Sequence, residues 1–355
     1  MRIAVITNAY PPRARGGAGR IAEMQVQMLQ AAGEEVRVWC PEILWFADPA
    51  PVRLLRHFQD LGARQEVAQD VLAWQPHVLL THNLTGCGFS TARAIQKRGV
   101  RWVHLLHDVQ LFEPSGQLIN AQQITTWQLF WTALRKLAFG NPDLVISPTL
   151  WLLRRHRHRG LFWPHHTQTE VLPNPSLPFQ RRQVSMHQPL RLLYVGRVSS
   201  EKGSELLMRL LPKIPFPFEF HVIGEGPDIP RLQQAFPAAQ IHGELPRAEV
   251  LEQMAQADVL LVPSRIEENQ PTVILEAASV GLPVIGSNQG GIPETLGRLG
   301  LVCPSMDVGA WVRTLEQLRT PFFFGGQVSH MEDIAHEHDP EMYRQRLLSL
   351  VRSKR

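Results

Sequence analysis

The sequence is poor in cysteine. Among its 355 residues there are three cysteines, Cys40, Cys87 and Cys303, which lie far apart and form no Cys-x-x-Cys pair. This pattern argues against a disulfide framework and against a cysteine-based zinc site. We therefore expect a reducing compartment and predict a cytoplasmic protein.

Long apolar runs are also missing. No stretch approaches the ~18 apolar residues that a membrane-spanning helix needs. The first residues, MRIAVITNAYPP, hold one basic residue and a short apolar run that two prolines end. They lack the length and the cleavage site of a signal peptide. The sequence does not decide whether the protein makes peripheral contact with the inner face of a membrane.

Charged residues are few, at 19%, whereas apolar residues make up 44%. This balance is typical of a globular chain and argues against disorder. The formal charge of +4 suits phosphorylated substrates, nucleic acid or an anionic membrane, and charge alone does not choose among them. Because the chain is longer than one typical hydrophobic core requires, we expect two domains.

Short β-rich runs alternate with helical patterns along the whole chain, which is typical of parallel sheets built from βαβ units. Most runs are apolar throughout, as in strands that are covered on both faces. The strands predicted in the first half are 2–7, 35–40, 77–81, 100–106, 143–147 and 170–172. Those predicted in the second half are 191–196, 218–224, 240–243, 258–264, 282–287 and 300–303. The fold class is therefore α/β, with one sheet in each half.

Between the halves, residues 171–191 are rich in proline and polar residues and lack helical periodicity, as interdomain linkers do. The end of the chain opens with Asp-Pro and has apolar residues at helical spacing, namely Met342, Leu347, Leu348 and Val351. We predict an N-terminal domain, a linker, a C-terminal domain and a terminal helix, over residues 1–178, 179–190, 191–335 and 336–355.

The second domain opens with LLYVGRVSSEKG, in which a strand ends at Gly196 and a short loop enters a helix near Gly203. Arg197 and Lys202 lie in this loop, where we expect free amides at the helix N-terminus. A planar guanidinium, an ammonium and helix amides together suit a diphosphate. Two solvated loop charges remain the alternative for this pair alone.

Two acids flank a predicted helix in the segment EENQPTVILEA. Pro271 suits the first helical position because it needs no amide partner there. Glu276 shares a narrow polar face with Thr272 and Ser279 on an otherwise apolar helix, and Glu268 precedes the helix. A partly buried carboxylate suits the vicinal diol of a ribose or hexose, because it accepts two hydroxyl hydrogen bonds. The alternative is an arginine partner or a loop cap.

In the first domain, the first strand leads to Gly16 and Gly17, which precede an amphipathic helix. Helix amides there either face an anion or belong to a flexible turn. A nicotinamide-binding fingerprint would need GxGxxG directly after the strand and an acid closing the second strand. The sequence has neither.

Histidines follow two other strands of the first domain. His107 emerges just past the strand 100–106 and is the best placed of them for chemistry, whereas His104 lies within the apolar run and is expected in the core. His82 and Asn83 follow the strand 77–81 and rank below His107. Parallel strands place these side chains at the sheet edge where open α/β sheets bind ligands.

A basic run, LRRHRHRGLFWPHH, begins at Leu153. One interpretation is a helix whose apolar side enters a membrane surface while its cations face lipid headgroups. The other is an ordinary charged helix that follows the strand 143–147. Histidine pairs such as His156 with His158 are expected to be solvated, and we predict no metal site.

Taken together, GGAGR, the pair His107-Asp108, VGRVSSEKG, VIGEGP, ADVLLVPS, EENQPTVILEA and GGIPE resemble the retaining glycosyltransferases of family 4, which have the GT-B fold. The resemblance spans nearly the whole chain. It is most specific in the second domain, where Glu268 and Glu276 meet the E-x7-E spacing. It implies two Rossmann-like domains facing a central cleft, and a C-terminal helix that crosses back to the first domain.

The resemblance also implies a nucleotide-diphospho sugar as donor, a carbohydrate or lipid-linked acceptor, no cofactor, no required metal and no nucleic acid. By the resemblance, Arg197 and Lys202 hold the donor diphosphate, over which the loop of Gly16 and Gly17 closes. Glu276 binds the donor ribose. The catalytic residues implied are His107 and Glu268, beside the donor sugar.

Further residues are implied to lie near the donor. The backbone of Asn269, Gln270, Pro271 and Thr272 would lie by the sugar or phosphate, and Gly224, Glu225 and Leu245 near the nucleotide. Because the family often has Phe-Gly after the first acid, the different residues here put the sugar's identity in doubt. The implied function is cell-surface polysaccharide, lipopolysaccharide or glycolipid synthesis. A sugar-nucleotide epimerase and a non-catalytic binding protein are the alternatives.

Acceptor choice is expected in two variable segments of the first domain, 41–58 and 113–131. Their tryptophans and phenylalanines either stack on sugar or lipid, or fill the core.

Overall fold

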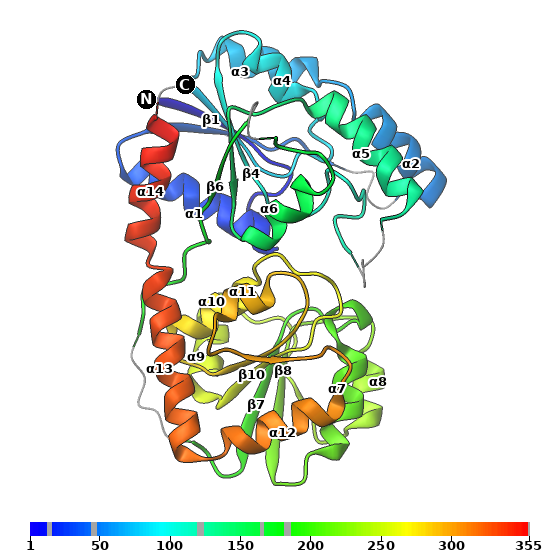
Figure 1. The fold of residues 1–355 in the computed structure, drawn as a ribbon, viewed down its shortest axis with the longest axis vertical. Coiled ribbons are helices and arrows are strands. Elements are labelled where there is room, and N and C mark those ends of the chain that lie inside the picture. Colours follow the sequence, from blue (N-terminus) through cyan, green and yellow to red (C-terminus); the bar gives the residue numbers. More distant parts are fainter. Residues whose placement is uncertain (13–15, 44–47, 119–123, 164–166, 181–185, 354–355) are drawn as a thin grey trace. The chain divides into compact units, whose positions relative to one another are not determined.

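The computed structural model describes residues 1–355 except 13–15, 44–47, 119–123, 164–166, 181–185 and 354–355. The chain forms two compact units (Figure 1). Unit 1 comprises Met1–Asn174 and Glu341–Arg355, and unit 2 comprises Pro175–Pro340. The boundaries predicted from the sequence lie after residues 178 and 335.

Unit 1 is built on a six-stranded parallel sheet of order β2-β1-β3-β4-β5-β6. Its strands are β1 (Arg2–Ile6), β2 (Glu35–Trp39), β3 (Val78–Thr81), β4 (Arg101–Leu105), β5 (Leu144–Ser147) and β6 (Gln168–Val171). Its helices are α1 (Gly17–Ala31), α2 (Ala50–Gln59), α3 (Gln65–Ala73), α4 (Thr91–Gln96), α5 (Thr126–Phe139), α6 (Leu150–Arg157) and α14 (Pro340–Arg352). All six predicted strands are present.

The central strands of unit 1 are apolar throughout because both faces of the sheet are covered. Alternate residues of a strand point to opposite faces, so Ile3 and Val5 enter one hydrophobic cluster while Ala4 and Ile6 enter another. Helices α1 and α14 cover the first face, and α3 to α6 contribute to the second.

Unit 2 is built on a second six-stranded parallel sheet, of order β12-β11-β10-β7-β8-β9. Its strands are β7 (Leu190–Val195), β8 (Phe218–Ile223), β9 (Gln240–Ile241), β10 (Val259–Val262), β11 (Val284–Ser287) and β12 (Leu301–Cys303). Two short 3-10 turns, η2 (Ser200–Lys202) and η3 (Leu211–Lys213), flank the first helix. The helices are α7 (Ser204–Leu210), α8 (Ile229–Ala235), α9 (Arg247–Gln256), α10 (Thr272–Ser279), α11 (Ile292–Leu296), α12 (Val308–Leu318) and α13 (Pro321–Glu337).

Each sheet has a point where the strand order reverses. In unit 1 it lies between β1 and β3, and in unit 2 between β7 and β10. Loops that leave the carboxyl ends of such strands diverge to opposite faces and form the crevice in which open α/β sheets bind ligands. The loop of Arg197 and Lys202 follows β7, and the loop of Glu268 follows β10. The predicted donor residues therefore flank the reversal point of unit 2.

The C-terminal helix α14 belongs to unit 1. Its Tyr343, Leu347 and Val351 are buried against the sheet, and Arg101 of β4 donates hydrogen bonds of 2.9 and 2.8 Å to the carbonyls of Leu350 and Val351. Met342, predicted on the buried face, is instead 63% exposed. Tyr343 takes the buried place because it precedes Leu347 by one helical turn.

We predict that Leu347→Ala lowers the free energy of unfolding of unit 1 by about 2–5 kcal/mol, because it leaves a cavity at a fully buried site. Met342→Ala on the same helix removes a largely exposed side chain and should change that free energy by less than about 0.5 kcal/mol. Denaturant unfolding of both variants measures the difference. Equal losses would show that α14 does not pack as described.

Candidate active site

The loop after β7 holds the two predicted cations. Arg197 is exposed at its start, and Lys202 is half-buried at the end of η2. The sequence predicted free amides at the N-terminus of the helix that follows. The prediction is wrong for the first two amides, because Gly203 and Ser204 donate their N–H groups to the carbonyls of Ser200 and Ser199 at 3.2 Å each. These two amides are therefore not available to an anion.

Lys202 contacts Glu268 across the reversal point of the sheet. Its Nζ forms an ion pair with Glu268 Oε1, and Ser264 Oγ donates to the same oxygen at 2.8 Å. Ser264 ends the predicted strand 258–264, and Glu268 lies in the loop that follows it. Two of the four charged residues chosen from the sequence thus touch, and Ser264 is an additional polar contact that the sequence did not single out.

Tyr194 stabilises the cation loop, by which we mean the loop after β7 that carries Arg197 and Lys202. Its hydroxyl donates to the carbonyl of Arg197 at 2.7 Å. Burial, with the nearby charge of Glu268, raises the pKa of Tyr194 well above its ordinary value. The hydroxyl therefore stays protonated and keeps its donor role. The sequence showed Tyr194 only as one residue of a strand.

The loop after β8 packs directly on the loop after β7. Val198 N donates to Glu225 O at 2.8 Å, and Gly224 N to Gly243 O at 2.7 Å. A Cβ at Gly224, whose φ is +126°, would lie 2.2 Å from the carbonyl oxygen of Gly196. Only glycine permits this approach, which brings Gly224 and Glu225 beside the loop of Arg197 and Lys202.

Glu276 lies on α10 and is 4% exposed. Its Oε1 is 3.5 Å from Nη2 of Arg247, the first residue of α9. The arginine partner that the sequence left open is therefore present. Arg247 was missed because nothing in its local sequence relates it to Glu276; only the packing of α9 beside α10 brings the two together.

The backbone between the two acids runs into α10. The helix begins at Thr272, with Pro271 at the N-cap position and no side chain capping the end. Gln270 is buried, with Nε2 3.2 Å from Nε2 of His338. Leu245, predicted near the nucleotide, packs partly buried against the hydrophobic cluster that includes α10.

In unit 1, His107 is paired with His82. His82 Nδ1 and His107 Nε2 are 2.8 Å apart, and the two rings stack. Burial lowers the pKa of His107 to about 4 and that of His82 well below its ordinary range. Both rings are therefore neutral near pH 7. His82, which ranked below His107, is its direct partner.

Two further polar residues at this sheet edge form a second pair. Asn83 Nδ2 donates to Asp108 Oδ2 at 2.7 Å, and Gln110 N donates to Asp108 Oδ1 at 2.8 Å. Burial raises the pKa of Asp108 to about 6. The carbonyl of Asn83 also accepts from Asn8 N at 3.0 Å, which links this edge to the loop that leads to Gly16.

The glycine loop itself ends at the N-terminus of α1. Gly16 is the N-cap residue, with φ of −72°, and no side chain caps this end. Gly16 and Gly17 are both exposed. Among the described residues, no atom lies within 4 Å of the place that a Cβ at Gly16 would take. Neither backbone conformation nor packing within unit 1 therefore requires glycine there.

The other expectations for unit 1 are settled by burial. His104 is a core residue, as expected, with Nδ1 2.8 Å from Thr81 Oγ1. The basic run forms the ordinary helix α6 after β5, and the membrane interpretation of it is wrong. Leu152 just before the run, and Leu153, Leu161 and Phe162 within it, are buried. His156 is fully buried as well, so the expectation that it is solvated is wrong. Residues 164–166 of the run lie outside the described residues.

Two searches of the described part of the chain gave no candidates. No group of three or more histidine, cysteine, aspartate or glutamate side chains is placed to hold a metal ion. None of the described helices combines the length and the apolar character needed to cross a bilayer.

Comparison with known families matches both units. The family described as glycosyl transferases group 1 matches residues 189–320, and the glycosyl transferase 4-like domain matches residues 16–175. The chain belongs to the group 1 glycosyltransferases of family 4. The two matches cover most of unit 2 and most of unit 1, respectively.

This glycosyltransferase is similar in sequence to the putative teichuronic acid biosynthesis glycosyltransferase TuaC of Bacillus subtilis (strain 168). The two are 25% identical over 347 residues, which is 84% of each chain. Among solved structures, sucrose-phosphate synthase of Thermosynechococcus elongatus gives a TM-score of 0.74 at 18% identity, over 99% of this chain and 98% of that one. HepE of Anabaena, in complex with UDP and glucose, gives 0.69 at 16% identity, over 99% of both chains. The glycosyltransferase has the two-unit α/β GT-B fold.

We predict that Gly203→Ala destabilises unit 2 more than Gly243→Ala. Both residues have left-handed φ, of +87° and +69°, so each alanine costs about 1–2 kcal/mol in backbone conformation. At Gly203 the new Cβ would also meet Pro263 O at 2.0 Å, whereas the described residues leave open space at Gly243. Denaturant unfolding measures both losses, and equal values would contradict the close packing of the cation loop on β10.

Proposed function

We propose that this chain transfers a sugar from a nucleotide-diphospho sugar to an acceptor hydroxyl, with retention at the anomeric carbon. The observation that carries the proposal is the contact of Lys202 with Glu268 across the reversal point of unit 2. It brings the cation proposed for the phosphate and the acid proposed for the sugar to one place, at the edge where open α/β sheets bind ligands. The proposed product belongs to cell-surface polysaccharide, lipopolysaccharide or glycolipid synthesis.

Arg197 and Lys202 bind the donor diphosphate in this proposal. An ammonium has three N–H donors, so Lys202 can contact phosphate while it keeps Glu268. The exposed guanidinium of Arg197 offers a planar fork to a second phosphate oxygen. As the sugar–phosphate bond breaks, these fixed cations stabilise the negative charge that develops on the leaving nucleoside diphosphate. The proposed transfer therefore requires no metal.

The two acids hold the other parts of the donor. Glu276 accepts hydrogen bonds from the ribose hydroxyls, with Arg247 fixing the position of its carboxylate. Glu268, held by Lys202 and Ser264, faces the donor sugar near its anomeric carbon. The backbone from Asn269 to Thr272 then lies by the sugar or phosphate, ahead of α10.

Unit 1 contributes His107 and the glycine loop. A neutral imidazole both donates and accepts one hydrogen bond, and His107, which pairs with His82, is proposed to lie beside the donor sugar. Gly16 and Gly17 close over the diphosphate. Their exposure, with no internal need for glycine at Gly16, supports a close approach of this backbone to a ligand.

The relatives support the substrate class. The name of TuaC connects that protein with teichuronic acid biosynthesis, and HepE, which shares the fold, holds UDP and glucose. A nucleotide sugar and a growing glycan or lipid-linked acceptor are accordingly the proposed substrates here.

Arg197→Ala and Glu276→Ala should each lower the rate of donor hydrolysis by about 10²- to 10³-fold, the usual loss when one aligned charge-stabilising group is removed. Arg209→Ala is the matched control, because Arg209 is an exposed arginine on the following helix α7 and should leave the rate unchanged. Initial rates at a low, fixed donor concentration, with equal thermal unfolding of all variants, check this. Wild-type rates in both site variants would refute the assignment.

A thermal-shift panel of UDP-, GDP- and ADP-sugars should identify the donor. A ligand present at 100 times its dissociation constant stabilises the folded state by about 2.7 kcal/mol. One nucleotide class should therefore raise the unfolding temperature of the wild type, and Glu276→Ala should reduce that rise. If no nucleotide sugar shifts the unfolding of the wild type, the proposed reaction is wrong.

A further inference from the structure

Helix α2 exposes its apolar stripe instead of burying it. Pro51, Leu54, Leu55 and Phe58 follow the i, i+3, i+4, i+7 spacing of one helix face, and Leu55 is 58% exposed. From residue 51 to residue 59, His57 is the one buried side chain. A stripe of this kind normally faces a hydrophobic core. On α2, Leu54 and Leu55 are exposed, while Phe58, 38% exposed, also packs against Trp131 of α5.

Helix α5 repeats the pattern beside α2. Its exposed apolar residues include Phe130 at 49% and Leu137 at 73% exposure, although Trp131, Arg135 and Phe139 on its other side are buried. Trp131 joins the two helices, because Phe58 and His57 of α2 both pack edge-on against its ring. Figure 1 shows α2 and α5 adjacent in unit 1.

We call this surface the α2–α5 face. It consists of eight exposed apolar residues, Val52, Leu54, Leu55, Phe58, Trp127, Leu129, Phe130 and Leu137. All of these except Leu137 lie in the two segments, 41–58 and 113–131, in which sequence alone did not decide between ligand contact and core. Leu55, Leu129 and Phe130 are at least about half exposed and are not core residues, whereas Phe58 and Trp127 also pack on the buried Trp131.

The charges of both helices have one sign. Neither Ala50–Gln59 nor Thr126–Phe139 contains an aspartate or glutamate, whereas Arg53, Arg56 and Lys136 are exposed. Asp48 lies 3.7 Å from Arg56 at the start of α2. A second copy of this chain would present the same cations to this face. An anionic surface complements it.

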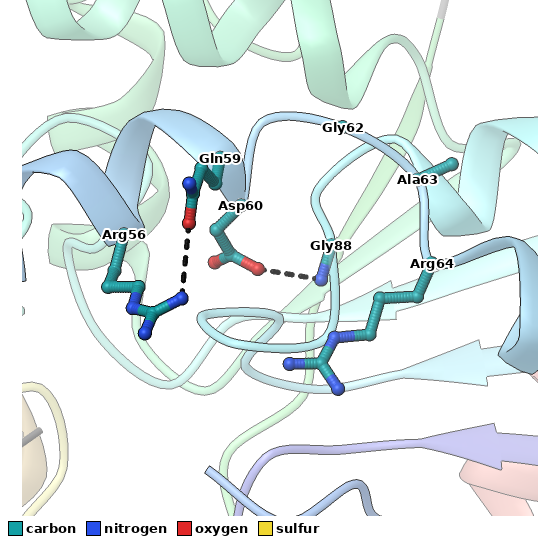
Figure 2. Close-up of a pocket in the computed structure, with 7 residues that line it drawn as sticks. All are labelled: Arg56, Gln59, Asp60, Gly62, Ala63, Arg64 and Gly88. Carbon is teal, nitrogen blue, oxygen red and sulfur yellow. Dashed lines mark hydrogen bonds between the residues drawn. The ribbon is translucent and has the colours of Figure 1, made fainter. Parts of the chain in front are cut away.

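A cavity of about 160 Å³ opens beside α2. Arg56 and Arg64 line it from two sides, together with Gln59 and the backbone of Gly88 (Figure 2). Asp60, at its base, accepts hydrogen bonds from the amides of Gly86 and Gly88 at 2.6 and 2.8 Å. Its two carboxylate oxygens are thus engaged by the protein, and the two guanidinium groups are the cations that a bound phosphate would meet.

We propose that the α2–α5 face docks on an anionic lipid bilayer, with its apolar side chains in the interfacial layer and a headgroup phosphate between Arg56 and Arg64. An amphipathic surface that combines exposed aromatic and aliphatic residues with arginines binds membranes in this way. Docking goes beyond the transfer reaction and does not rest on it. It places unit 1 at the surface where a lipid-linked acceptor is found.

The test is co-sedimentation of the full chain with phosphatidylcholine vesicles, with and without phosphatidylglycerol. The wild type should sediment with the phosphatidylglycerol vesicles, and raised salt should weaken binding by screening. Leu55→Glu combined with Phe130→Glu should weaken binding at least about tenfold. Arg56→Gln combined with Arg64→Gln should weaken it roughly fivefold per arginine, and only on phosphatidylglycerol.

Two matched controls separate this face from other exposed aromatics. Phe322→Glu alters a side chain of unit 2 that is 95% exposed, and Trp163→Glu alters the end of the basic run. Both should bind like the wild type. Donor hydrolysis without vesicles and thermal unfolding should be unchanged in every variant, so that loss of docking is distinguished from loss of folding or of the donor site.

Three results would overturn the proposal. The first is that the wild type stays in the supernatant with phosphatidylglycerol vesicles. The second is that the Leu55 and Phe130 variant binds as tightly as the wild type. The third is that Trp163→Glu abolishes binding. Light scattering tests the remaining alternative, that a second copy of this chain covers the α2–α5 face. A wild-type dimer that the Leu55 and Phe130 substitutions dissociate, without vesicle binding, would assign the face to a second copy instead.

Discussion

The proposed donor site depends on the parallel pairing of β7 with β10. Leu192 and Leu193 of β7 lie opposite Val259 and Leu260 of β10, so both strands end at one edge although long stretches of sequence separate them. The loops that follow are brought together by this register and not by any local sequence. The ion pair of Lys202 with Glu268 is its direct consequence. Close packing of glycine backbone adds the loop after β8 to the same edge.

Much of this arrangement could be predicted from the sequence. Strands buried on both faces are largely apolar, which made the central strands of both sheets recognisable. Because parallel strands share one carboxyl edge, residues just beyond their ends were expected to lie together, as Lys202 and Glu268 do. The pairing of individual side chains near the carboxyl edge of each sheet could not be predicted. Arg247 meets Glu276, and His82 meets His107, only through the packing of separate elements.

Amphipathic patterns show why the surface was harder to predict than the core. The spacing of apolar residues predicts that a helix has an apolar side, but not what that side contacts. In the basic run the apolar side of α6 is buried in unit 1, along with His156. In α2 the corresponding stripe is exposed, and His57 is the side chain turned inward. The two helices have similar composition and opposite orientations, because neighbouring elements decide which side is covered.

The position of α14 has a consequence for synthesis on the ribosome. Unit 1 takes its last helix from the end of the chain, after the whole of unit 2 has been translated. Until then, the face of the sheet that receives Tyr343, Leu347 and Val351 lacks part of its cover. A nascent unit 1 therefore exposes an apolar surface throughout the synthesis of unit 2, and this is the interval in which it needs protection from aggregation.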